Sequence, residues 1–248
     1  MRIVVIIPAR YGSTRFPGKP LARIAGKPML EHVCTQAAAC TGVSDVVVAT
    51  DDDRVLACVQ AFGGKAVMTA SHHVSGTDRI AEAAKILQLD DQDIVVNVQG
   101  DQPLVPPPVL AEMIAPFEED EALLMTTLMY RIRDPEEVDN PNHVKVVTDT
   151  HGFALYFSRH PIPFHREPES KPVHYKHLGL YAYRTAFLKI FTGLPEGRLE
   201  AAEKLEQLRA LEHGYRIRVV ETDFDSPEVD TPGDVHRVEA LMARAPVS

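Results

Sequence analysis

The stretch that decides the fold is Ile3-Val4-Val5-Ile6-Ile7, which passes directly into Pro8-Ala9-Arg10-Tyr11-Gly12-Ser13-Thr14-Arg15-Phe16-Pro17-Gly18-Lys19-Pro20. Five successive β-branched residues favour a central strand of a parallel sheet that is covered on both faces. The prolines and glycines that follow prevent a regular helix from starting at once. The sequence therefore predicts a buried strand that ends in an irregular loop.

Three cations lie in this loop, Arg10, Arg15 and Lys19. Each supplies hydrogen-bond donors as well as charge, so three cations that converge at the carboxyl end of a strand can hold a triphosphate. The loop is not a Walker A loop, because five residues rather than four separate Gly12 from Gly18 and Pro20 replaces Ser or Thr. It also lacks the Gly-x-Gly-x-x-Gly dinucleotide motif. A solvated basic turn is the alternative interpretation.

The composition is that of a soluble globular protein. The 248 residues, 45% of them hydrophobic and 25% charged, suffice for one large domain or for a domain with a smaller subdomain. Lys and Arg number 26 against 35 Asp and Glu, a formal net charge of −9. A cationic loop in an acidic protein favours a small anionic ligand over a nucleic-acid polymer.

The chain shows no sign of secretion or membrane insertion. No apolar stretch reaches the length of a membrane span, and Met1-Arg2-Ile3 leads into a strand rather than into a signal peptide. Cys34, Cys40 and Cys58 lack metal-type spacing and suit a reducing compartment. We therefore expect a cytoplasmic protein without a membrane partner.

Strands and helices alternate after the loop. Helical spacing over residues 29–40 precedes a strand at 45–50, a helix that runs to Phe62 and a short strand at 65–68. This order predicts an α/β fold, a Rossmann-like, mostly parallel sheet with helices on both faces. Residues 51–53, all Asp, are interpreted as helix caps, with a metal site as the alternative. A further helix is expected over 80–89, with Thr77 as a possible cap.

Another apolar strand, at 93–98, delivers Gln99-Gly100-Asp101-Gln102 to its carboxyl end. Ligands of open α/β sheets bind outside the carboxyl ends of the strands, so Asp101 should face the same crevice as Arg10 and Lys19. Mg²⁺ binds through one or two carboxylates plus phosphate oxygens, which makes Asp101 a candidate ligand. The alternative is an ordinary turn aspartate.

The middle of the chain is richer in strands. They are predicted at 123–130, 144–148, 154–157 and 177–183, so residues of about 123–195 should contain an antiparallel insertion. His177 and Tyr181 share one strand face, about 13 Å apart if the strand is regular. They could line a groove or form a partly buried polar face. Acidic residues 118–121 and residues 161–172 are predicted as exposed loops.

Two features close the chain. A helix is predicted over residues 199–211, with Glu206 and Gln207 off its apolar stripe. Val229-Asp230-Thr231-Pro232 then predicts the start of a final helix, with Thr231 as N-cap and Pro232 at the first position. A carboxylate at Asp230, just before this helix, can compensate the helix dipole.

Taken together, these stretches resemble the sugar nucleotidyltransferases over nearly the whole chain. Within that family, the loop from Pro8 to Leu21 is most similar to the cytidylyltransferases that act on 3-deoxy-manno-octulosonate (Kdo), an acidic eight-carbon sugar. The resemblance implies a single nucleotidyltransferase domain over 1–248, an insertion that binds the acceptor sugar, and a homodimer. Gln102 departs from the pattern, which has Glu there.

The resemblance also implies the reaction and the residues. CMP would pass from CTP to Kdo, with release of pyrophosphate, for lipopolysaccharide biosynthesis. Asp101 and Asp230 would bind Mg²⁺ and form the catalytic set with Lys19 and Arg15. Nucleotide contacts would be Pro8, Ala9, Arg10, Gly12, Ser13, Lys19, Ser75, Arg79 and Gln99. Sugar contacts would be Gln99, Arg159, His177, Tyr181, Glu206 and Gln207.

Two other functions stay open from the sequence. One is a cytidylyltransferase for another acidic sugar, 8-amino-Kdo or a sialic acid, although the loop favours the Kdo group over the sialic-acid group. The other is a catalytically silent nucleotide-binding module. The presence of the whole cationic loop and of both acids disfavours this second alternative.

Overall fold

The computed structural model describes residues 1–12, 16–167, 173–225 and 227–244. The chain forms two compact units, Met1–Ala111 with Ser226–Ser248, and Glu112–Asp225. The insertion expected at about 123–195 falls within the second unit. Ser13 and Arg15 of the cationic loop lie outside the described residues.

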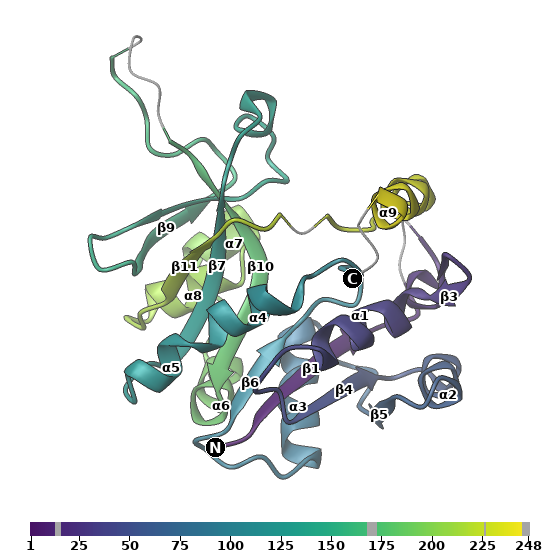
Figure 1. Ribbon diagram of the computed structural model, residues 1–248. Coiled ribbons are helices and arrows are strands. Elements are labelled where there is room, and N and C mark those ends of the chain that lie inside the picture. The colour runs from purple at the N-terminus through teal and green to yellow at the C-terminus, as the bar shows by residue number, and fades with distance from the viewer. Residues whose placement is uncertain (13–15, 168–172, 226, 245–248) are drawn as a thin grey trace. The chain divides into compact units, whose positions relative to one another are not determined.

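The first unit is built on a parallel sheet in the order β6-β1-β4-β5 (Figure 1). β1 (Ile3–Ala9) pairs with both β4 (Asp45–Thr50) and β6 (Ile94–Asn97), and β4 pairs with β5 (Lys65–Met68). Val5, Ile6 and Ile7 are completely buried, as expected of a β-branched run between two helix layers. The predicted mostly parallel α/β fold is confirmed.

Helices follow the strands of this unit. They are α1 (Met29–Ala38), α2 (Asp53–Ala61), α3 (Gly76–Ile86) and α4 (Pro107–Ile114), which continues into the second unit. Asp52 caps α2 by accepting from the Arg54 amide, so the predicted cap is confirmed for one of the three aspartates. α3 starts earlier than predicted, because Ser75 rather than Thr77 is its N-cap and Asp78 completes a capping box.

The last helix, α9 (Pro232–Arg244), returns to the first unit. Val229 and Val238 pack with Ile24 and Met29 in a buried cluster beside the small hairpin of β2 (Arg23–Ile24) and β3 (Lys27–Pro28). The Ala25 amide also donates to the Glu239 carboxylate. This packing fixes the residues just before α9 to the first unit.

The second unit has a mixed sheet. β10 (Tyr175–Arg184) is antiparallel to β7 (Met125–Arg131) and β8 (Lys145–Thr148), β8 is antiparallel to β9 (Ala154–Ser158), and β7 is parallel to β11 (Arg218–Thr222). Its helical segments are α5 (Pro116–Glu119), η2 (Pro135–Glu137), α6 (Thr185–Gly193), α7 (Arg198–Glu203) and α8 (Gln207–Glu212). The predicted antiparallel character is confirmed, but part of the acidic loop at 118–121 belongs to α5.

The helix predicted over 199–211 is wrong, because α7 and α8 replace it. Lys204 adopts a left-handed conformation with φ of 52° and ends α7. The Arg209 guanidinium on α8 reaches back to the Glu200 carboxylate on α7, which holds the two short helices together. Gln207 therefore stands at the start of α8 and is buried rather than on a helix surface.

Candidate functional site

The loop after β1 is closed at its base. The Gly18 amide donates to the Tyr11 carbonyl over 3.1 Å, and Gly18 has a left-handed φ of 71°. A Cβ at Gly18 would lie 3.3 Å from Cζ of Tyr11, so glycine permits both the turn and the close approach of the ring. The short 3₁₀ helix η1 (Lys19–Leu21) starts at once and fixes the direction of Lys19.

Tyr11 is also held from α2. The guanidinium carbon of Arg54 lies 3.3 Å from the centroid of the Tyr11 ring, and Arg54 donates in turn to the Asp52 carboxylate. This cation–π contact connects the loop to the start of α2. Sequence reasoning missed both residues, although an aromatic side chain within a basic loop was a signal.

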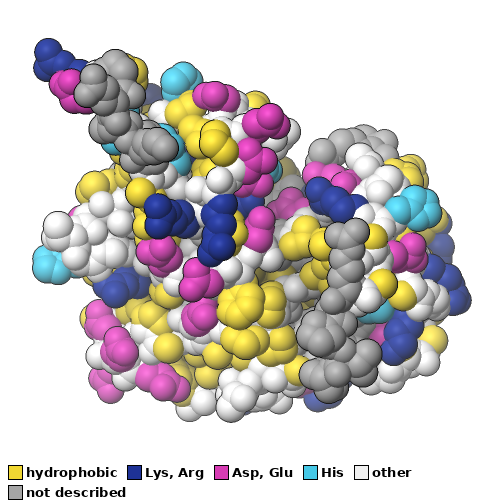
Figure 2. All heavy atoms as spheres, turned by 45° about the horizontal axis from the view of Figure 1, so that its top comes forward, with side chains coloured by type: hydrophobic (Ala, Val, Ile, Leu, Met, Phe, Trp, Pro, Cys, Tyr) yellow, Lys and Arg dark blue, Asp and Glu magenta, His cyan; other side chains and the backbone are white. Residues whose placement is uncertain are grey.

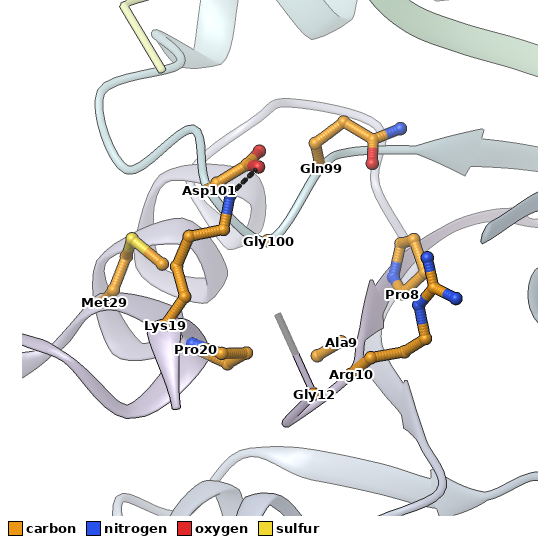
Figure 3. Close-up of a pocket in the computed structure, with 10 residues that line it drawn as sticks. All are labelled: Pro8, Ala9, Arg10, Gly12, Lys19, Pro20, Met29, Gln99, Gly100 and Asp101. Carbon is orange, nitrogen blue, oxygen red and sulfur yellow. Dashed lines mark hydrogen bonds and ion pairs between the residues drawn. The ribbon is translucent and has the colours of Figure 1, made fainter. Parts of the chain in front are cut away.

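A cavity of about 410 Å³ opens at the carboxyl ends of β1 and β6 (Figure 3). Arg10 lies on one side of it, and Lys19 and Asp101 lie together on the other. A Cβ at Gly100 would lie 3.3 Å from the Pro8 carbonyl, so glycine lets the two strand ends come together. The lining is formed by Pro8, Ala9, Arg10, Gly12, Lys19, Pro20, Met29, Gln99, Gly100 and Asp101.

Lys19 lies between two carboxylates. Its Nζ is 2.6 Å from Oδ2 of Asp101 and 3.4 Å from Oδ1 of Asp230. The side chains of Lys19, Asp101 and Asp230 are 16%, 24% and 36% exposed, so solvent only partly screens their charges. Burial opposes the ammonium charge, but the two carboxylates outweigh it and raise the pKa of Lys19. The structure thus brings Asp230 to Asp101 and Lys19.

Asp230 reaches the site because its segment is fixed on both sides. The Val229 amide donates to the Asp101 carbonyl over 2.9 Å, and the Asp230 amide donates to the Asp234 carboxylate. The predicted start of α9 is confirmed, because the helix begins at Pro232 directly after Thr231, whose amide and hydroxyl both donate to the Asp234 carboxylate. Glu228, which sequence reasoning missed, reaches solvent, yet the surrounding protein and the carboxylates of Asp101 and Asp230 raise its pKa to about 7.

The two aspartates fit a magnesium ion that also binds phosphate. Among the described residues, no group of three or more His, Cys, Asp or Glu side chains could hold a metal ion by itself. Mg²⁺ commonly uses only one or two carboxylates and takes its other ligands from phosphate and water. Two carboxylates that already converge on one cation, Lys19, are consistent with that chemistry.

Two predicted nucleotide contacts have other partners. Ser75 caps α3, whose first residue, Gly76, lies next to Pro8. The Arg79 side chain is completely buried and donates to Asp51 at 2.8 Å and to Thr69 at 2.6 Å. The buried guanidinium thus already has protein partners, and the contact of Arg79 with CTP stays a prediction. Gln99 lines the cavity and donates to Asn97.

In the second unit, the guanidinium of Arg159 is occupied. It donates to the main-chain carbonyls of Glu203, Pro141 and Lys204. These bonds tie the end of β9 to the turn after α7. The contact of Arg159 with the sugar stays a prediction.

His177 and Tyr181 are in contact, contrary to the predicted separation. Their ring centroids lie 5.3 Å apart, because the pairing of β10 with β7 shifts register between them and Gly179 has φ of +64°. The Thr127 hydroxyl donates to the Leu180 carbonyl and lies 2.9 Å from Nε2 of His177, which therefore donates to it. Burial lowers the pKa of His177 to about 3.

Glu206 and Gln207 lie at the start of α8. Burial and the Glu206 charge raise the pKa of Tyr181, which places Glu206 close to that phenol. Gln207 is only 3% exposed, and its Nε2 has no hydrogen-bond partner within the described parts of the chain. The structure thus gathers four of the predicted sugar contacts around β10 and α8, within one unit.

The neutral His177 gives a prediction for acid stability. The ordinary His pKa of 6.5 applies to the unfolded chain, whereas the folded value is about 3. The unfolded chain therefore binds more protons between these values, and the stabilisation by neutral His177, complete above pH 6.5, declines as the pH falls. Urea titrations at about pH 7 and about pH 5 should show a smaller loss of stability for His177→Asn than for the wild type.

His236, whose side chain is 87% exposed, provides the control. His236→Asn should keep the wild-type dependence on pH. Equal acid sensitivity of His177→Asn and the wild type would show that His177 is not the group responsible.

The fold and this pocket are typical of α/β proteins that bind nucleotides at the carboxyl ends of parallel strands. The family model described as Cytidylyltransferase matches residues 4–217. The chain belongs to the cytidylyltransferase family.

Similar proteins cover almost the whole chain. A 3-deoxy-manno-octulosonate cytidylyltransferase of Desulfosudis oleivorans is 56% identical over 98% of each chain. An 8-amino-3,8-dideoxy-manno-octulosonate cytidylyltransferase of Shewanella piezotolerans is 54% identical over 98% of this chain and 99% of its own. A solved structure of CMP:2-keto-3-deoxy-manno-octonic acid synthetase complexed with CTP is 47% identical, with a TM-score of 0.93 over 98% of this chain and 99% of that one. The resemblance inferred from sequence is confirmed.

Proposed function

We propose that the protein transfers CMP from CTP to Kdo and releases pyrophosphate, a step that would serve lipopolysaccharide biosynthesis. The observation that supports this most is the position of Lys19 between Asp101 and Asp230, within a cavity at the strand ends. The names and the high identity of the relatives support the choice of CTP and Kdo.

The reaction needs positioning and charge more than a protein nucleophile. The anomeric hydroxyl of Kdo attacks the α-phosphorus of CTP, the bond to the bridging oxygen of pyrophosphate breaks, and the hydroxyl proton passes to solvent. Lys19 and Arg10 hold the phosphates, with Arg15 and Ser13 of the same loop as further contacts. Asp101 and Asp230 would hold Mg²⁺, which offsets phosphate charge and lowers the pKa of the attacking hydroxyl.

We assign the sugar to the polar group around β10. His177 and Tyr181 supply ring faces and a hydroxyl, while Glu206 and the buried amide of Gln207 can bind sugar hydroxyls. Gln99, which lines the cavity of the first unit, stays a predicted contact of both the nucleotide and the sugar. Because His177 is uncharged at neutral pH, it would act as a hydrogen-bonding group and not as a counter-ion for the sugar carboxylate.

A transferase for 8-amino-Kdo is the second candidate, because relatives with that name are 54% identical to the chain. The test is to incubate the protein with CTP and Mg²⁺, add Kdo, 8-amino-Kdo or a sialic acid, and follow pyrophosphate. We expect fastest release with Kdo. Faster release with 8-amino-Kdo would favour the second candidate, and no release with any sugar would favour a silent nucleotide-binding module.

We also propose a cellular location and an oligomeric state for the protein. All three cysteines are free thiols, which suits the cytoplasm. No described helix combines the length and apolar character that crossing a membrane requires. On the face in Figure 2, Lys and Arg side chains are interspersed with Asp and Glu, a mixed surface that does not call for a polyanionic partner. A homodimer is expected and can be tested by sedimentation.

The contact between Tyr11 and Arg54 gives a prediction for nucleotide binding. Tyr11→Ala removes the ring that holds the base of the loop and should raise KM for CTP about threefold, with a smaller change in kcat. Tyr11→Phe keeps the ring and should behave as the wild type. A wild-type KM for Tyr11→Ala, measured by pyrophosphate release, would exclude this role.

A further inference from the structure

Gln102 and Glu228 form a polar contact immediately behind the two aspartates. Nε2 of Gln102 donates to Oε1 of Glu228 over 3.2 Å. Gln102 is only 1% exposed and directly follows Asp101, whereas Glu228 precedes Asp230 by two residues and its side chain reaches solvent. The contact therefore connects the two segments that supply the carboxylates.

The two segments meet in a short, ordered junction. The Val229 amide donates to the Asp101 carbonyl over 2.9 Å, and the Val229 side chain is completely buried in the cluster with Ile24 and Met29. The Glu228 carbonyl accepts from Arg237 on α9. The contact of Gln102 with Glu228 adds a side-chain hydrogen bond to this junction, beside the main-chain bond from Val229 to Asp101.

We propose that Gln102 and Glu228 are a positioning pair, which sets the separation of Asp101 and Asp230 and thereby the affinity of these two carboxylates for a divalent cation. The proposal rests on the proposed function in one respect only, because it takes this carboxylate pair as the metal site. Neither member of the positioning pair is assigned a contact with a substrate.

The pair can be exchanged between the two positions. Glu228→Gln keeps an oxygen that accepts from Gln102, so it removes a charge but keeps the bond. Gln102→Glu replaces the donor by a second acceptor at mildly alkaline pH, where carboxylates are ionised. In the double variant Gln102→Glu with Glu228→Gln, the donor and the acceptor change places and the net charge returns to that of the wild type.

Two readouts test the pair without activity. The first is hydrogen exchange of the Val229 amide, which reports whether the junction is closed. The second is binding of Mn²⁺ alone, followed by electron paramagnetic resonance. Gln102→Glu should exchange faster at Val229 and bind Mn²⁺ about 10-fold more weakly, and the double variant should recover both properties. Glu228→Gln should keep slow exchange.

The sign of the Mn²⁺ result discriminates between explanations. Gln102→Glu adds a negative charge, so a purely electrostatic effect would tighten Mn²⁺ binding, whereas loss of positioning weakens it. Tighter binding, or a defect that persists in the double variant, would overturn the proposal. Should Gln102→Glu fail to fold, Gln102→Met removes the donor without adding charge and should show the same fast exchange; wild-type exchange in Gln102→Met would also overturn it.

Turnover separates this proposal from the proposed function. If the wild type released no pyrophosphate with any acidic sugar, the proposed function would fail. Hydrogen exchange at the Val229 amide and Mn²⁺ binding would still test whether Gln102 and Glu228 position the two carboxylates. If the wild type is active, we expect Gln102→Glu to lower kcat more than it changes KM for CTP, and the double variant to restore kcat. If the wild type is active but the double variant does not restore kcat, the positioning pair is rejected and the proposed function stands.

Discussion

Asp101→Asn is expected to fold normally and to lose about 99 to 99.9% of turnover. Asn has the shape of Asp, and Lys19 retains the Asp230 carboxylate as a partner. The loss arises because a neutral amide binds Mg²⁺ far more weakly than a carboxylate does, and Asp101 is one of only two proposed protein ligands. The measurement is kcat from pyrophosphate release at saturating CTP and Kdo, with thermal unfolding as the test of folding.

The matched control is Asp223→Asn. Asp223 is 95% exposed and its distance to Arg133 is 3.4 Å, so its carboxylate has no part in the proposed site. Its substitution should leave both kcat and the unfolding temperature unchanged. Near-normal turnover of Asp101→Asn that a chelator does not reduce would contradict the assignment of the metal site.

Lys19→Met is expected to lower kcat/KM for CTP by about 10- to 100-fold. The change removes one charged donor to the triphosphate, and hydrogen bonds to charged groups contribute about 1.5–3 kcal/mol each. It also leaves Asp101 and Asp230 facing each other without the ammonium that lies 2.6 and 3.4 Å from them. Initial rates over a range of CTP concentrations, at fixed Mg²⁺ and Kdo, give the ratio.

Lys27→Met provides the comparison on the surface. The Lys27 side chain is 58% exposed and pairs with Glu31 at 2.9 Å. Lys27→Met therefore removes a similar ion pair, but one away from the cavity. We expect wild-type kinetics for this variant. Unchanged kinetics for Lys19→Met would instead remove Lys19 from the nucleotide site.

The backbone of the first unit was largely predictable from sequence. β1, β4, β5 and β6 follow from runs of β-branched and apolar residues, and the carboxyl ends of such parallel strands share one edge of the sheet. Residue pattern alone therefore suffices to place Lys19 and Asp101 in one crevice. It does not suffice for Asp230, because nothing local shows that α9 packs on Ile24 and Met29; its role came from resemblance.

The protein partners of two long side chains could not be predicted from sequence. Arg79 and Arg159 were predicted as ligand contacts, and their protein partners, such as Asp51 and Glu203, lie 28 and 44 residues away. The contact of His177 with Tyr181 depends on a register shift in β10, and the break between α7 and α8 depends on a left-handed Lys204. Residue type and spacing do not encode either local departure from regular geometry.

Lys19 also has a consequence for the energetics of substrate entry. In the protein without substrate, the Lys19 ammonium is the counter-ion of both carboxylates, so neither Asp101 nor Asp230 lacks a positive partner. If Asp101 and Asp230 hold Mg²⁺ as proposed, the ion would replace the ammonium at these carboxylates, and Lys19 would become available to the phosphates. Loading would then be an exchange of counter-ions at the two carboxylates.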